Sequence, residues 1–312
     1  MYFLRLLRLP NLLMVLATLV VPYWFVLRLA ILKAGGIPVL TEHSFGLLAT
    51  VTVLTTLAGY WINDFYDVEI DAINKGEKHR STGRFLRPNG LFFLYVAATF
   101  GVFALSLALY LNLSIPGMVW PLWVFPLVST LLFLYAWQIK CTPLVGNLLV
   151  ATLCGVVPLL CLLPESRPIL LSSINHPNEI HDAVGLVWIY AVFAFVTNLW
   201  REQVKDMEDF EGDAACGCHT LPVLRGLNYA KKPAGVTGIS VAALIVILLY
   251  FWFETGASML QLAAGFVFLL LPALVGSILL LRAQSKKHFS YASLLIKLLM
   301  LAGLILLLRP IP

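Results

Sequence analysis

Charged residues are scarce in this chain of 312 residues: Asp, Glu, Lys and Arg together make up only 12%, whereas 60% of the residues are hydrophobic. A soluble domain normally carries about twice that share of charge. Long apolar runs recur about every 30 residues, and each is long enough to cross a bilayer. The scarcity of charge therefore argues against a soluble enzyme and predicts an all-α protein with many membrane-spanning helices.

Two further features are missing. The first apolar run is followed by proline and bulky residues, so we expect no cleavable signal peptide. The five cysteines show no pairing pattern, and no disulfide framework is inferred. Cys216, Cys218 and His219 form a C-x-C-H pattern, which is only a weak indication of metal binding.

The apolar runs predict about nine transmembrane helices within one polytopic domain, residues 1–312. Their approximate ranges are 11–31, 44–62, 91–111, 117–138, 144–163, 183–201, 235–253, 258–281 and 290–309. With a cytoplasmic N-terminus, 16 Lys and Arg residues fall on that side and 4 on the other. The positive-inside rule then places the N-terminus in the cytoplasm. We expect an integral protein of the inner cell membrane. The net charge of +5 indicates topology rather than a nucleic-acid partner.

Acidic residues gather in two short stretches, 64–77 and 202–213, which hold 11 of the 16. Both stretches contain aspartates at the spacing i, i+3, i+7, namely Asp64, Asp67, Asp71 and Asp206, Asp209, Asp213. On one helix, these offsets would place three carboxylates on one face, where they repel each other unless a cation neutralises them. Carboxylate oxygens suit Mg²⁺, and two such ions would neutralise a diphosphate and improve it as a leaving group.

The two motifs also indicate an internal repeat. Asp64 and Asp206 lie 142 residues apart, each at the end of the second helix of a four-helix set. We therefore expect two four-helix pseudo-repeats, about 1–140 and 141–285, with one helix appended. In this topology both motifs lie on cytoplasmic loops, which would form a cap over the active site.

Polar residues near the motifs are candidates for substrate binding. They are Asn63, Arg80, Lys140, Asn147, Asn198, Arg201 and Lys205. Arg and Lys clamp diphosphate oxygens, although each charge here has the alternative of an ordinary positive-inside residue. The amides have the alternative of bridging helices. Lys297, inside the last helix, is expected to snorkel to the membrane surface.

The motifs carry a family resemblance. Asn63-Asp64-x-x-Asp67-x-x-x-Asp71 and Asp206-x-x-Asp209-x-x-x-Asp213 resemble the two Asp-rich motifs of the UbiA superfamily of intramembrane prenyltransferases. The resemblance covers most of the chain, and the run from Gly212 to Pro222 is similar to the branch of digeranylgeranylglyceryl phosphate synthases and of the homogentisate and chlorophyll enzymes. Family members commonly carry an Arg-Pro pair soon after the first motif, and the run from Glu77 to Ser81 contains Arg80 but lacks that proline.

This resemblance implies a Mg²⁺-dependent enzyme. It would move a polyprenyl group from its diphosphate to a lipophilic or aromatic acceptor and release pyrophosphate. All six aspartates would be catalytic, and Asp64, Asp67, Asp206 and Asp209 would hold the metal, with Asn63 assisting. Lys140, Arg201 and Lys205 would bind the diphosphate. The acceptor, the prenyl chain length and the oligomeric state have no readable motif.

Two other classes fit part of the pattern. A CDP-alcohol phosphotransferase also binds Mg²⁺ with membrane aspartates, but the duplicated motif argues against it. A transporter of divalent cations or of another substrate could also carry acidic clusters and repeats. Transporter sites usually lie near the bilayer midplane, whereas both motifs here are predicted at one face of the membrane.

Overall fold

The computed structural model describes residues 7–75, 88–113, 115, 117–254 and 256–306. Within these ranges the chain is helical and contains no strand. It divides into two compact units. The first unit comprises Met1–Ile139, Val156–Tyr190 and Pro310–Pro312, and the second comprises Lys140–Gly155 and Ala191–Arg309.

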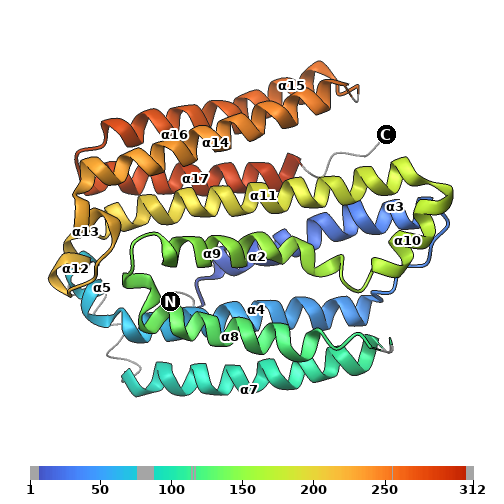
Figure 1. Cartoon of the computed structure of the whole chain (residues 1–312), viewed down its shortest axis with the longest axis horizontal. Coiled ribbons are helices and arrows are strands. Elements are labelled where there is room, and N and C mark those ends of the chain that lie inside the picture. Colours follow the sequence, from blue (N-terminus) through green and yellow to red (C-terminus); the bar gives the residue numbers. More distant parts are fainter. Residues whose placement is uncertain (1–6, 76–87, 114, 116, 255, 307–312) are drawn as a thin grey trace. The chain divides into compact units, whose positions relative to one another are not determined.

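The first unit is built around α4 (Glu42–Tyr66), which packs against α7 (Pro88–Leu113) and α8 (Pro121–Trp137) (Figure 1). Small side chains let these helices approach each other: Ala58, Ala98 and Ala136 belong to one buried cluster. The other elements are α2 (Leu9–Pro22), the π-helical turn η1 (Tyr23–Leu27), α3 (Arg28–Lys33), α5 (Val68–Lys75), the 3₁₀ turn η3 (Val157–Cys161) and α10 (Ser166–Asn175).

Helix α11 (Pro177–Glu208) begins in the first unit and continues into the second. In the second unit, α16 (Leu271–Arg282) packs against α14 (Leu227–Glu254) and α17 (Lys286–Leu306) (Figure 1). The remaining elements are η2 (Ile139–Cys141), which starts at the last residue of the first unit, α9 (Val145–Val156), α12 (Phe210–Ala215), α13 (Leu221–Arg225), α15 (Met259–Gly265) and the π-helical turn η4 (Phe266–Leu270).

The helices agree with a protein that crosses the membrane many times. Each of the nine predicted spans coincides with helical structure. In the described ranges, seven helices are long and apolar enough to cross a bilayer, or eight if one bent pair counts as a span, and α8 is shorter. The chain is thus an integral, multi-pass membrane protein, and the number of nine spans stays a prediction.

Two predicted spans differ in detail. The fifth, predicted at 144–163, ends at a bend of 59° that separates Val145–Cys161 from a further helix, Ser166–Asn175. Prolines at positions 158, 164 and 168 explain this break, because proline cannot continue the helical hydrogen-bond ladder. The sixth helix was predicted at 183–201 but runs to Glu208. The apolar run ends at the predicted boundary, residue 201, yet the Arg, Glu, Gln, Lys and Met residues between 201 and 208 are good helix formers.

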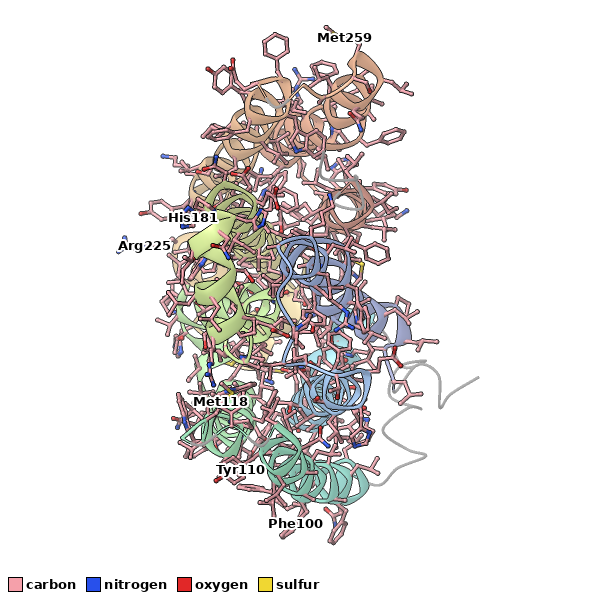
Figure 2. The ribbon with its side chains drawn as sticks, turned by 90° about the vertical axis from the view of Figure 1, so that its right-hand side faces the viewer. Phe100, Tyr110, Met118, His181, Arg225 and Met259 are labelled. Atoms are coloured by element: carbon pink, nitrogen blue, oxygen red, sulfur yellow. A yellow bond between two sulfur atoms is a disulfide. The ribbon has the colours of Figure 1, made fainter. Side chains whose placement is uncertain are left out.

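Large apolar side chains cover the outside of both units. In Figure 2, Phe100 of α7 and Met259 of α15 point outward, and they are 72% and 75% exposed. Such exposure would be unfavourable in water but is favourable against lipid chains. The apolar surface therefore belongs in the bilayer.

One buried carboxylate organises the loop between α3 and α4. Glu165 is 0% exposed. Its carboxylate accepts hydrogen bonds of 2.9 Å from the Tyr23 hydroxyl and from the backbone N–H groups of Val39 and Leu40. Three donors offset the cost of burying the charge. Glu165 thereby fixes the α3–α4 loop to the bend that precedes α10.

Close packing of α9 on α11 gives a stability prediction. A Cβ added at Gly155 would lie 2.9 Å from the Cβ of Phe195 and 3.1 Å from the carbonyl oxygen of Ala191. Because both contacts involve atoms close to the backbone, we expect Gly155→Ala to destabilise the protein by about 1–3 kcal/mol. The measurement is the midpoint of thermal unfolding in detergent, which should fall by several degrees.

Gly46→Ala provides the matched control, because a Cβ added at Gly46 meets no atom within 4 Å. Alanine is the better helix former by about 0.5–1 kcal/mol, so this variant should leave the midpoint unchanged or raise it. Equal midpoints for the two variants would contradict the described packing of α9 on α11.

Candidate functional site

The two aspartate motifs have the same local structure. Asp64 lies in the last turn of α4, Asp67 forms the break after it, and Asp71 lies in α5. In the second motif, Asp206 lies in the last turn of α11, the break falls at Asp209, and Asp213 lies in α12. The backbone angles at the breaks agree, with φ −90° and ψ 0° at Asp67 and φ −91° and ψ 5° at Asp209.

This geometry corrects one expectation. A single uninterrupted helix does not carry the three aspartates of either motif. Each helix is interrupted at the second aspartate, and a separate short helix follows it. Asp readily takes such a conformation, because its short side chain competes with the helical hydrogen bonds of the backbone. The same break in both motifs is consistent with an internal repeat.

The charges of all three carboxylates of the first motif act on one guanidinium. Arg8 forms an ion pair with Asp64, and the charges of Asp67 and Asp71 also act on it. The Arg8 guanidinium additionally lies 5.0 Å from the centre of the Tyr60 ring. Burial lowers the pKa of Arg8, but the charge of Asp64 and of the other carboxylates raises it, so the net pKa lies above the usual value.

Arg8 is held at the start of α2 in an unusual conformation. It is the N-cap residue of that helix and has a φ of 45°, in the left-handed region that non-glycine residues rarely adopt. Such a conformation costs on the order of 1 kcal/mol, and it recurs at functional sites. No spacing pattern predicts the contact, because Arg8 and Asp64 lie 56 residues apart in sequence.

In the second motif, an amide contacts the first aspartate. Asn147, which is 5% exposed in α9, donates a hydrogen bond of 2.8 Å from its Nδ2 to the Oδ2 of Asp206. The carboxylates of Glu202 and Asp213 and the ammonium of Lys205 are the charges that act on Asp206. The structure therefore brings together Asn147, Lys205 and two aspartates of this motif, whereas the predicted role of Asn147 in substrate binding stays a prediction.

The segment after the second motif is tied back to it. The Thr220 hydroxyl lies 3.2 Å from Oδ2 of Asp213, and the N–H of Cys218 donates to the Asp213 carbonyl at 2.9 Å. Cys218 is disulfide-bonded to Cys141, with the two Cα atoms 4.5 Å apart. The N–H of His219 donates to the Cys141 carbonyl at 2.9 Å. Four links thus close the segment that follows Asp213.

The disulfide corrects the cysteine prediction. The sequence predicts no disulfide framework, because the five cysteines show no pairing pattern, whereas the structure joins two of them that lie 77 residues apart. The pair also removes Cys218 from the weak C-x-C-H metal pattern, since a disulfide sulfur is not available as a thiolate ligand. The fold brings the two cysteines together by placing the turn before α9 beside the segment after α12.

The remaining predicted residues are placed as follows. Asn63 donates to Asp67 within the first motif. Lys140 lies in η2, directly before Cys141. Asn198 donates a hydrogen bond of 2.8 Å from its amide nitrogen to the Ala194 carbonyl of its own helix, α11. Arg201 pairs with Glu202 at 2.5 Å. Arg80 lies outside the described residues.

The oxygen donors of the motifs fit Mg²⁺. No group of three or more His, Cys, Asp or Glu side chains within the described ranges is arranged to hold a metal ion by itself. Mg²⁺ does not need one, because proteins usually hold it with one or two carboxylates while waters and substrate phosphates complete the coordination. Each motif supplies such carboxylates, so the donor set suits a Mg²⁺ ion that accompanies a diphosphate.

Comparison with known proteins gives a consistent result. The profile of the UbiA prenyltransferase family matches residues 19–301. Digeranylgeranylglyceryl phosphate synthase of Thermococcus kodakarensis is 31% identical over 272 residues, which cover 86% of this chain and 85% of that protein.

Two solved structures share the fold. A structure described as digeranylgeranylglyceryl phosphate synthase has a TM-score of 0.63 at 22% identity, and the match covers 99% of this chain and 97% of the other. A UbiA homologue from Archaeoglobus fulgidus, bound to GPP and Mg²⁺, has a TM-score of 0.55 at 14% identity, with 98% and 99% covered.

The disulfide gives the second prediction. Titration of the denatured, unreduced protein should find three thiols among the five cysteines, because Cys141 and Cys218 are bonded to each other. Cys141→Ser should lower the midpoint of thermal unfolding by several degrees, because the cross-link closes a long loop that otherwise gains entropy on unfolding.

Cys216→Ser is the control, since this neighbouring cysteine lies outside the disulfide. It should leave the midpoint unchanged. Five titratable thiols in protein purified without reductant would show that the bond does not form.

Proposed function

The chain belongs to the UbiA prenyltransferase family and is a prenyltransferase, and from this premise we propose that it transfers a geranylgeranyl group to geranylgeranylglyceryl phosphate. The observation that carries the proposal is the duplicated aspartate motif, with the same backbone break in both copies, in a chain that matches the family over most of its length. The name of the archaeal relative described above supports this choice of acceptor.

In this proposal the aspartates of both motifs serve as the metal site. Two Mg²⁺ ions accompany the prenyl diphosphate and, when bound, neutralise its charge so that pyrophosphate becomes a better leaving group. The residues that would hold them are Asp64, Asp67, Asp206 and Asp209, with Asn63 assisting and Asp71 and Asp213 completing the sites. Asn147 orients the carboxylate of Asp206, which its amide contacts at 2.8 Å.

Cations on the same elements bind the substrate phosphates. Lys205 directly precedes Asp206, and Arg201 lies one turn earlier in α11. Lys140 lies beside the disulfide that closes the second motif. Arg and Lys donate charge-assisted hydrogen bonds to phosphate oxygens and stabilise the charge that develops on the leaving group. Arg80 is proposed for the same role from the sequence alone.

The reaction is an alkyl transfer. The bond between C1 of the prenyl chain and the diphosphate oxygen breaks, and pyrophosphate leaves with the electron pair. A hydroxyl oxygen of the glyceryl acceptor forms the new bond to C1, and the hydroxyl proton passes to the departing pyrophosphate. Loss of pyrophosphate leaves an allylic cation at C1. Because this cation reacts readily with water, the apolar walls of the protein must exclude water from it.

The orientation in the membrane and the domain organisation are further parts of the proposal. We propose a cytoplasmic N-terminus with both motifs on the cytoplasmic side, in the inner cell membrane, from the distribution of Lys and Arg. We also propose a single domain made of two pseudo-repeats. The comparisons give no support to a CDP-alcohol phosphotransferase or to a transporter.

An acceptor panel tests the proposed function. The purified protein, in lipid with Mg²⁺ and radiolabelled geranylgeranyl diphosphate, is offered geranylgeranylglyceryl phosphate, homogentisate, 4-hydroxybenzoate or 1,4-dihydroxy-2-naphthoate. We expect label transfer to geranylgeranylglyceryl phosphate, dependent on Mg²⁺ and abolished by EDTA. Asp64→Asn and Asp206→Asn should each lower kcat by at least about a hundredfold, because each removes a charge that holds the metal.

Glu69→Gln is the matched control, since Glu69 is an exposed carboxylate between the second and third aspartates of the first motif. Its activity should stay within about twofold of the wild type. Transfer to another acceptor alone would reject the proposed acceptor while keeping the enzyme class. Full activity of Asp64→Asn would reject the site.

A further inference from the structure

Lys297 lies too deep in its helix for the snorkelling expected from the sequence. Helix α17 begins at Lys286, so Lys297 follows its start by 11 residues, which is about 16 Å along the axis. Snorkelling serves charged residues near the ends of membrane helices. A cation three turns inside the helix instead needs a partner, and an intramembrane charge of this kind is a reason to look for a functional site.

The register of α17 against α11 identifies the neighbours of Lys297. The Ser290 hydroxyl lies 2.6 Å from Oε1 of Glu208. A Cβ added at Gly303 would lie 2.8 Å from the ring of Phe193. The two helices therefore run antiparallel, side by side in the second unit (Figure 1). Lys297 lies seven residues after Ser290, on the same face of α17. Arg201 lies seven residues before Glu208 in α11, so Lys297 and Arg201 are at the same level.

The electrostatics agree with this register. The charges that act most strongly on the Lys297 ammonium are those of Arg201 and Lys205, and the carboxylates of Glu202 and Glu208 follow. Three cations thus lie close together on α11 and α17. Like charges in a partly dehydrated place repel each other, so this arrangement favours the binding of an anion.

The nearby carboxylates are already engaged. Glu202 pairs with the Nη1 of Arg201 at 2.5 Å, and Glu208 contacts Ser290. The Nε of Arg201 is buried, and no partner for it is found among the described residues. A buried donor without an acceptor costs free energy, which a ligand oxygen would recover. The Lys297 side chain is exposed in the isolated chain, so a ligand can reach it.

We propose that Lys297, with Arg201 and Lys205, binds a phosphate group of a substrate. The planar guanidinium and two ammonium groups suit the several oxygens of a phosphate. The proposal rests on the function proposed above, in which both the donor diphosphate and the glyceryl phosphate acceptor carry phosphate. It adds to the site a residue from α17 that neither aspartate motif contains.

The test compares Lys297→Met with the wild type in the full-length protein in lipid nanodiscs. Methionine keeps a long unbranched side chain but removes the charge. We expect an increase of about tenfold in one KM, with kcat within about threefold, because one charge-assisted contact is lost. An increase for geranylgeranyl diphosphate assigns the site to the donor, and an increase for geranylgeranylglyceryl phosphate assigns it to the acceptor.

Two controls and a binding measurement complete the test. Lys297→Arg should restore most of the affinity, and Lys287→Met, which alters an exposed lysine in the first turn of α17, should leave both KM values unchanged. Equilibrium binding of each substrate should change as its KM does, which tests the site without turnover.

Failure of this inference is separable from failure of the proposed function. A wild-type protein that transfers no prenyl group contradicts the proposed function, whereas the binding difference between Lys297→Met and wild type still tests the cluster. KM values and affinities within about twofold of wild type for both substrates would overturn the role of Lys297. An increase in KM for Lys287→Met equal to that for Lys297→Met would also overturn the role of Lys297.

Discussion

The cost of placing carboxylates at the edge of an apolar protein shapes this molecule. An unpaired charge inside a bilayer costs at least about 3 kcal/mol, and each motif collects three aspartates where a long membrane helix ends. The structure gives several of these carboxylates a nearby donor: Arg8 for Asp64, Asn147 for Asp206, and Thr220 for Asp213. These contacts hold the carboxylates in place, and they explain why polar residues lie at these helix ends.

The repeated break at the second aspartate has a consequence for chemistry. An unbroken helix would fix the third carboxylate one turn beyond the second. Because the helix is interrupted at Asp67 and at Asp209, the third aspartate lies in a separate short helix, whose position depends on further anchors. In the second motif those anchors are Thr220, the backbone of Cys218 and the disulfide to Cys141. Preorganised oxygens of this kind lower the cost of gathering a metal and a diphosphate.

Sequence alone predicts what depends on local pattern. The apolar runs predict the helices, and the aspartate spacing identifies both motifs. Both signals depend only on residues that are close together in the sequence. The contacts of Arg8, Asn147 and the cysteine pair depend on packing between residues 56 to 77 positions apart. Asn147 was predicted only as a candidate, whereas Arg8 as the partner of Asp64 and the disulfide carried no local signal. Lys297 was assigned to the membrane surface because sequence spacing does not reveal the antiparallel register with α11.

The central claim is that the two aspartate motifs bind a prenyl diphosphate through Mg²⁺. Equilibrium binding of geranylgeranyl diphosphate, measured without acceptor while Mg²⁺ is varied, tests it most directly. The account predicts that binding requires Mg²⁺ and weakens by at least about tenfold when either Asp67 or Asp209 is replaced by Asn, since each carboxylate is a proposed ligand. Tight binding that is the same with and without Mg²⁺, and in both variants, would contradict it.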